Sequence, residues 1–172
     1  MKNLVTCLCL LPLLMGCAPV YDLGPSPSLR IAEAADIDVN DVLLVAPCEY
    51  AITFEDKRQA TWQHGIVGCT TQAIYVFNYQ GRNQPLKRVV NVAYAEMQKV
   101  ALDSFLDSLQ VHVYMSNYML VVVPTPNGKT FIDRASTRKV HEIITAHGVT
   151  SIKTADPVFG PEPRYVPIVI AH

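Results

Sequence analysis

From residue 43 onward, the chain alternates short apolar runs with residues that favour turns. Val, Ile, Tyr, Phe and Thr are frequent in the runs, and Gly, Asn, Pro or charged residues separate them, which is typical of β-strands joined by hairpin connections. Strands of this length and spacing predict an antiparallel meander that closes on itself as a barrel or a sandwich. The expected strands cover residues 43–54, 61–69, 73–79, 88–93, 98–104, 109–114, 118–124 and 129–132.

The hydrophobic period changes after residue 135 from alternation to helical spacing. A helix over residues 136–147 would carry three apolar residues on one face, namely Val140, Ile143 and Ile144. Ser136 is suited to cap its first turn, and Gly148 is suited to follow its last turn. We therefore predict a mainly β fold with one α-helix: an antiparallel barrel of seven to eight strands, covered at an open end or side by a C-terminal amphipathic helix.

The first 16 residues form a leader that has one positive charge, at Lys2, and an apolar run from Leu4 to Leu14. A helix that spans a membrane needs about 20 apolar residues. This run is shorter, and it contains Pro12. The pattern is typical of a signal peptide over residues 1–16.

The leader ends in Leu14-Met15-Gly16-Cys17, which resembles the lipobox of bacterial lipoproteins. The resemblance implies cleavage before Cys17 and acyl chains, palmitate among them, on the new N-terminal cysteine, so that the membrane is a partner. Two or three chains anchor a protein stably where one does not. Ala18 stands where an aspartate tends to retain such proteins in the inner membrane, so the resemblance favours the outer membrane, facing the periplasm. The alternative is an ordinary signal peptide in which Cys17 is incidental.

Composition divides the remaining chain into three parts. Residues 17–36 contain the lipidation site and many Pro, Gly and Ser residues, which predicts a flexible, extended tether with a short helix around residues 31–35. Residues 37–149 hold the expected barrel and helix as one domain. Residues 150–172 form a Pro-rich tail that ends in an apolar, β-branched segment, Tyr165–Ile170.

Charge and motifs limit the function. The mature chain keeps 13 Lys and Arg residues against 15 Asp and Glu residues, a formal charge of −2. Because nucleic acids require clustered positive charge, we expect none as a partner. No hydrolase, nucleotide-binding or zinc-protease motif is present, and His141 and His147 lie on different faces of the expected helix. We therefore expect no enzyme activity, no catalytic residue, no cofactor and no metal site.

Besides Cys17, the mature chain keeps two cysteines, Cys48 and Cys69. They lie on consecutive expected strands whose connection is centred near residue 58, and an antiparallel hairpin with that register places them opposite each other. A disulfide is then within reach in an oxidising periplasm. The alternative, two buried thiols that pack as small apolar side chains, stays open, because a register shift of one residue turns a side chain to the other face.

Two blocks of the sequence resemble GRAM and bacterial PH-like domains. Residues 65–75 combine a glycine, alternating apolar residues, a Thr turn and an aliphatic-aromatic pair, as that family's second and third strands do. Residues 90–100 are similar to its next block, and Phe131 with the expected helix matches its closing strand and helix. Gly68 departs from the pattern, because the family usually has a bulky apolar residue there. The resemblance covers residues 40–148 and implies a PH-like barrel.

These observations predict a lipoprotein of the bacterial cell envelope that acts as a membrane-anchored, non-enzymatic binding or scaffold module for a protein partner. One alternative is a structural subunit of an envelope or secretion complex that docks through its tail. The tail would either add a strand to a partner's sheet or pack on its own domain, through Tyr165, Val166, Ile168 and Ile170. A second alternative is a periplasmic carrier of a lipid or small ligand, which needs a large apolar cavity inside the barrel.

Overall fold

The computed structural model describes residues 21–54, 57–105, 108–126, 132–153 and 157–159. Within them, eight strands form one sheet in the order β4-β3-β2-β1-β7-β6-β5-β8. All neighbouring strands are antiparallel except β5 and β8, which are parallel. The strands are β1 (Val42–Thr53), β2 (Gln63–Thr70), β3 (Ala73–Asn78), β4 (Lys87–Ala93), β5 (Lys99–Phe105), β6 (Ser108–Tyr114), β7 (Met119–Pro124) and β8 (Ser151–Ile152).

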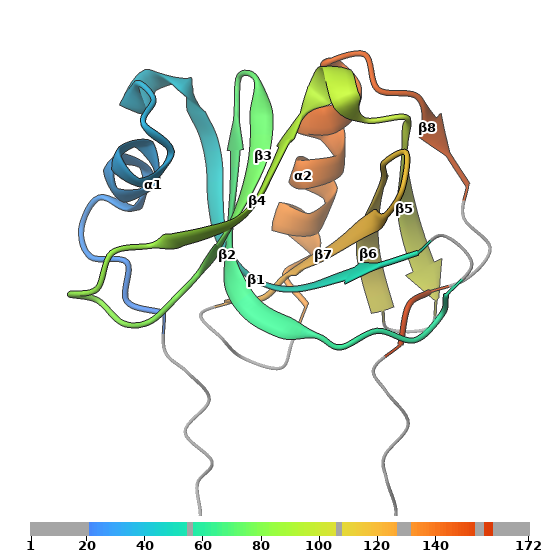
Figure 1. Cartoon of the computed structure of the whole chain (residues 1–172), viewed down its shortest axis with the longest axis horizontal. Helices are drawn as coiled ribbons and strands as arrows, with labels where there is room; N and C mark the ends of the chain where they lie inside the picture. The colour runs from blue at the N-terminus through green and yellow to red at the C-terminus, as the bar shows by residue number, and fades with distance from the viewer. Residues whose placement is uncertain (1–20, 55–56, 106–107, 127–131, 154–156, 160–172) are drawn as a thin grey trace, which may run out of the picture.

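The long strand β1 belongs to both halves of the sheet. It pairs with β2 from Val42 to Tyr50 and with β7 from Cys48 to Thr53, so the sheet bends around a shared interior (Figure 1). Between β4 and β5 the chain passes through a short 3-10 helix, η2 (Tyr94–Glu96), and no ladder joins these two strands in the described residues. The barrel therefore has an open seam along β4.

Helix α2 (Arg134–Ala146) packs against β5, β6 and β7. The predicted buried face is confirmed, because Val140, Ile143 and Ile144 are all buried. The predicted cap is wrong: the Asp133 carboxylate accepts a hydrogen bond from the Ser136 N–H at 3.0 Å, so the helix begins before Ser136. The fold class is as predicted, mainly β and antiparallel with a C-terminal amphipathic helix.

Seven strands lie where the sequence pattern predicts them, and the eighth does not. The expected strand over residues 129–132 and its Phe131 lie outside the described residues, except for Ile132, which is not in a strand. The eighth strand instead follows α2, where Ser151 and Ile152 pair with β5. Two residues are too few to produce a recognisable alternation, so the sequence pattern could not locate this strand.

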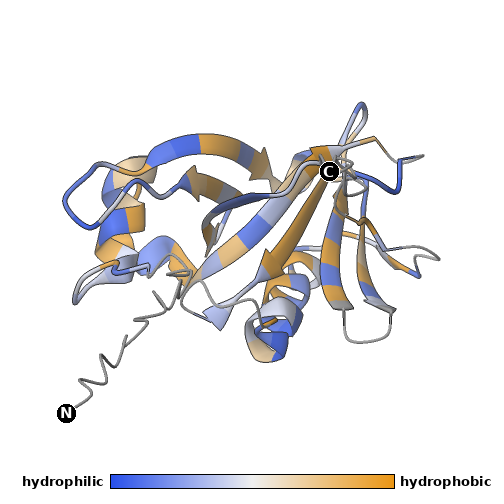
Figure 2. Ribbon diagram, turned by 90° about the horizontal axis from the view of Figure 1, so that it is seen from below, coloured by the Kyte–Doolittle hydropathy of each residue, from blue (hydrophilic) through white to orange (hydrophobic). Residues whose placement is uncertain are grey.

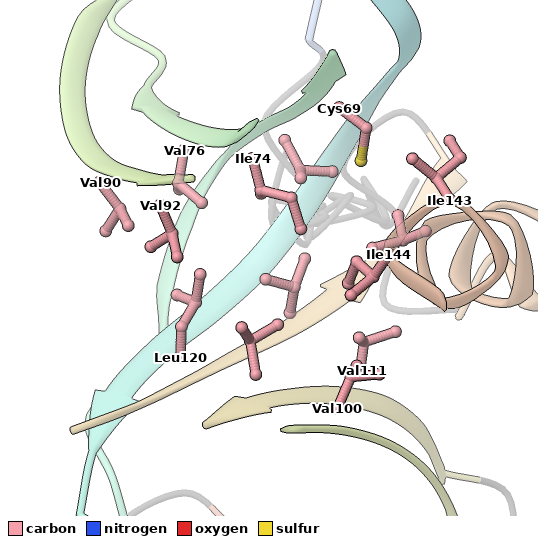
Figure 3. Packing of buried hydrophobic residues seen from close by; sticks show 14 of the residues in the cluster. Cys69, Ile74, Val76, Val90, Val92, Val100, Val111, Leu120, Ile143 and Ile144 are labelled. Atoms are coloured by element: carbon pink, nitrogen blue, oxygen red, sulfur yellow. The ribbon is translucent and has the colours of Figure 1, made fainter. Parts of the chain in front are cut away.

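Apolar side chains from both halves of the sheet and from α2 fill the barrel. Figure 2 shows apolar and polar residues alternating along the strands, as expected for strands with one face on a core. In Figure 3, side chains of β4, β6, β7 and α2 point toward one another, and four of them are 0% exposed: Val92, Val111, Leu120 and Ile144.

Helix α1 (Pro27–Ala35) covers the outer face of the first half of the sheet; it contains the short helix predicted around residues 31–35 and corrects the tether prediction for the residues before it. Its residues Ile31 and Ala35 join a second apolar cluster, which also contains Tyr21. The chain is thus packed from Tyr21 onward, and residues 27–29, which were expected to be extended, form the first turn of α1. The Pro-rich composition misled the prediction because proline is well tolerated at the first position of a helix.

Gly68 of β2 allows α1 to approach the sheet closely. A Cβ atom at Gly68 would lie 2.9 Å from Cγ2 of Ile31, which is 0% exposed. The bulky residue that the family resemblance leads one to expect at position 68 is therefore absent, and Ile31 of α1 occupies the space.

We expect Gly68→Ala to lower the free energy of unfolding by about 1 kcal/mol, because the new methyl group displaces Ile31. Ile31→Ala alone should cost about 2 to 4 kcal/mol. In that background Gly68→Ala should cost nothing further, since the contacting atoms are gone. Urea unfolding, followed by the fluorescence of Trp62, the single tryptophan, measures the free energy of unfolding of the two single variants and of the double variant. Strictly additive losses would contradict the contact.

Candidate functional site

The residues that the sequence assigns to membrane and partner contact lie outside the described residues. They are Cys17, Tyr165, Val166, Ile168 and Ile170. The structure does describe the segments that lead to them. Tyr21 and Phe159 are the outermost described residues, and both adjoining segments are held on the domain by specific contacts.

The segment that leads to Cys17 is fixed on the connection between β3 and β4. The Tyr21 ring is buried, 4.9 Å from the ring of Tyr79, and burial raises the pKa of Tyr21 to about 12. The Tyr79 hydroxyl donates to the Asp22 carbonyl oxygen at 2.8 Å and accepts from the Asp22 N–H at 3.0 Å. Arg82 adds an exposed ion pair to the Asp22 carboxylate at 3.1 Å. The chain therefore enters the domain at one defined place.

The segment that leads to the tail is held on the outer face of the second half of the sheet. The Gln110 side chain of β6 binds the backbone of Val158 twice: its Nε2 donates to the Val158 oxygen at 2.9 Å, and its Oε1 accepts from the Val158 N–H at 3.0 Å. The backbone of Phe159 pairs with Arg58 and Ala60 at 2.7 and 3.0 Å. Val158 packs in a third apolar cluster, with Ala101, Tyr114, Met119 and Val121.

His112 lies beside this contact and is 1% exposed. Its Nε2 is 2.9 Å from Gln110 Oε1. The two bonds to Val158 fix which end of the Gln110 amide is oxygen, so His112 carries its proton on Nε2. Its Nδ1 is buried without a hydrogen-bond partner in the described part of the chain. Burial lowers the pKa of His112 from 6.5 to about 4, so the ring is neutral at physiological pH.

A groove of about 280 Å³ opens at the seam of the barrel. It is lined by Ile52 of β1, Tyr118 of the β6–β7 turn, and residues 89–91 of β4. Ile52 is 49% exposed and Val89 is 39% exposed, so apolar surface faces solvent here. Because β4 pairs only with β3 in the described residues, its other edge also offers backbone groups to an added strand. This seam groove is the candidate site for a partner of extended backbone.

The structure does not bring Cys48 and Cys69 together as opposed residues. Cys48 lies opposite Gly65, and Cys69 lies opposite Leu44. The predicted register is therefore wrong, and both thiols are free and buried. Burial raises the pKa of both, that of Cys69 to about 12, which keeps them protonated and unreactive. The alternative of two buried thiols in the core describes this structure.

The described residues contain no group of His, Cys, Asp and Glu side chains that would hold a metal ion. His141 contacts the Ser151 hydroxyl at 3.0 Å, and His147 contacts the Ile143 carbonyl oxygen at 2.7 Å, so each has a local structural partner. In the part of the chain that the structure covers, no helix has the length and hydropathy to cross a membrane.

Sequence reasoning missed Gln110 and Val158, which are 48 positions apart. One signal was present: Gln110 and His112 are polar residues at alternate positions of β6, between apolar residues. Alternation alone places them on the outer face, where solvent is the usual neighbour. Nothing in the pattern says that a later segment covers that face.

No protein-family model matches the chain, and no curated protein does. Among solved structures, the chain is similar to inhibited Vav1, with 11% identity and a TM-score of 0.48 over 70% of this chain. It is similar to the Slm1 PH domain in complex with inositol-4-phosphate, with 13% identity and a TM-score of 0.41 over 61% of this chain and 94% of that one. It is also similar to the hSac2 domain of human phosphoinositide phosphatase Sac2, with 10% identity and a TM-score of 0.41 over 81% of this chain and 93% of that one.

The chain spans only 17 to 32% of the Vav1 chains that it matches. At these identities and scores the likeness carries no ligand, substrate or activity over to this protein.

Proposed function

We propose that this protein is a lipoprotein of the bacterial cell envelope, anchored in the outer membrane through acyl chains on Cys17 and facing the periplasm. Its barrel is a non-enzymatic binding or scaffold module for an envelope protein. The observation that carries the proposal is Leu14-Met15-Gly16-Cys17 at the end of a short apolar leader. The formal charge of −2 on the mature chain fits it, because attraction to anionic lipid then contributes little and the acyl chains must hold the protein.

The short link between Cys17 and the folded chain supports this arrangement. Tyr21 is already buried in the domain, and four extended residues span at most about 14 Å. The acylated cysteine would therefore hold the end of the domain that carries Tyr79 and Arg82 close to the lipid headgroups. The faces of the barrel away from this end would stay available to a protein partner.

A structural subunit of an envelope complex is the second candidate. The chain that leads to the apolar tail runs beside the connection that follows β1. Ile52, near the end of β1, and Phe54, directly after it, are exposed. Exposed apolar surface on the domain and an apolar tail in the sequence both favour contact with another protein. The lipid carrier is disfavoured, because the described interior of the barrel is filled by buried side chains.

We expect Cys17→Ser to abolish incorporation of radiolabelled palmitate and to leave an unprocessed precursor, because the acylated sulfur is removed. Metabolic labelling and a gel shift measure both results. Cys9→Ser is the matched control, since it removes a cysteine of the leader and should leave labelling unchanged. Labelling that persists in Cys17→Ser would refute the anchor, and recovery of labelled wild type in the inner-membrane fraction would refute the outer-membrane assignment.

A further inference from the structure

The edge of β4 has the features of a strand-docking site. Residues 89–91 of β4 include no charged side chain, and β4 has no second strand partner among the described residues. Natural proteins protect exposed edges with charge, bulges or a covering segment. The charged residues Lys87 and Arg88 guard only the beginning of β4, so the apolar part is the kind of edge that another segment covers.

We propose that the seam groove beside β4 is a strand-docking site and that its occupant is the chain's own segment Tyr165–Ile170. The side chains available on the two sides match in chemistry. The groove is lined by Ile52, Val90 and Tyr118 among others, and the segment offers four β-branched residues, which favour an extended backbone. This inference goes beyond the lipoprotein function and does not rest on acylation of Cys17.

The covalent link permits docking within one molecule. Phe159 is hydrogen-bonded to Arg58 and next to Ala60, in the connection that follows the end of β1. Ile52 of the groove is only six positions before Arg58. The six steps from Phe159 to Tyr165 span at most about 20 Å when extended. The tail therefore starts from a fixed point on the connection that follows β1, the strand that supplies Ile52 to the groove, and the high effective concentration favours its own domain over a second copy.

Pro167 sets the phase of the added strand. A proline has no N–H to donate, so it is tolerated in an edge strand only where its backbone nitrogen faces away from the neighbour. The backbone groups of Val166 and Ile168 then face β4. Val166, Ile168 and Ile170 share one face of the extended segment, and this face fills the groove, while Val169 faces solvent. The residue before a proline also prefers the extended conformation, which suits Val166.

Limited trypsin digestion of the full chain in detergent tests the docking, because Arg164–Tyr165 is a tryptic bond directly before the segment. We expect the native chain to be cleaved there at least tenfold more slowly than Ile168→Asp. Val169→Asp is the matched control on the opposite face and should behave as wild type. Val89→Lys should expose the same bond from the groove side, whereas Leu43→Lys, at an exposed residue of β1 outside the groove, should not.

Amide hydrogen exchange of β4 provides the second measurement. Ile168→Asp should raise the exchange rate of a peptide covering residues 87–93, and Val169→Asp should leave it unchanged. Equal cleavage and exchange in wild type and Ile168→Asp would overturn the proposal. Protection that disappears on dilution would assign the groove to the tail of a second copy and would equally overturn docking within one molecule. Neither result would affect palmitate labelling of Cys17, so the two proposals fail separately.

Discussion

Gly65→Ala should lower the free energy of unfolding by about 3 kcal/mol, at the upper end of what overpacking costs. A Cβ atom at Gly65 of β2 would lie 2.6 Å from the carbonyl oxygen of Phe77 and 3.0 Å from the ring of Tyr50. Phe77 is 0% exposed and Tyr50 is 1% exposed. The Tyr50 hydroxyl is further held 2.7 Å from Gln63 Oε1 and 2.9 Å from Asn78 Oδ1. The Phe77 carbonyl cannot move away without moving β3, and the Tyr50 ring cannot move away without breaking its hydroxyl contacts.

Gly68→Ala on the same strand is the matched comparison, because its new methyl group meets a side chain and not a backbone oxygen. Urea unfolding of both variants, followed by Trp62 fluorescence and by far-ultraviolet circular dichroism, gives the two losses. Gly65→Ala should lose clearly more stability, and Ile31→Ala should rescue only Gly68→Ala. Equal losses at the two positions would mean that β3 yields easily and that the close approach of Phe77 is not a constraint.

The positions of seven strands and of α2 follow from the sequence because each has one face on the barrel interior. Alternate residues of the strands and the face of α2 with Val140, Ile143 and Ile144 bury the same core, so the periodic signal is strong. The N-terminal helix was harder to predict. Its short apolar face, centred on Ile31, is preceded by prolines and glycines that are equally typical of a tether.

The register of β1 and β2 could not be read from the two strands alone. The prediction assumed a symmetric hairpin centred near residue 58. In the structure, Arg58 and Ala60 pair with Phe159 of the C-terminal segment, so this part of the connection does not continue the hairpin. The ladder instead has Cys48 opposite Gly65. Cys69 therefore lies four positions along β2 from Gly65, the partner of Cys48, and this offset separates the two cysteines.

The same segment explains why the candidate site was only partly predictable. The apolar segment Tyr165–Ile170 is visible in the sequence, because a run of β-branched residues needs cover. Its point of departure is not visible, since it depends on two hydrogen bonds between Gln110 and Val158. A polar side chain on the outer face of a strand gives the same alternation whether water or a backbone segment satisfies it.

Acidification should destabilise the protein through His112, the buried neighbour of that contact. In the unfolded chain this imidazole takes up a proton near its ordinary pKa of 6.5, whereas burial lowers its pKa to about 4 in the folded chain. Between these values the unfolded state binds more protons, so the free energy of unfolding falls as the pH falls from 6.5 toward 4. The full shift corresponds to about 3 kcal/mol, and the stabilisation is fully present above pH 6.5.

His112→Leu removes this titration, so the free energy of unfolding of the variant should fall less than that of wild type over the same pH range. Urea unfolding at several pH values, followed by Trp62 fluorescence, measures the difference, and Trp62 packs against the cluster that contains Val158. His64→Gln is the matched control for the loss of an imidazole, because His64 has an exposed side chain. Parallel losses in wild type and His112→Leu would show that the folded protein accommodates the charge. A steeper loss in wild type alone would mean that the cost lies in charging the buried imidazole, whose Nδ1 has no hydrogen-bond partner in the described part of the chain.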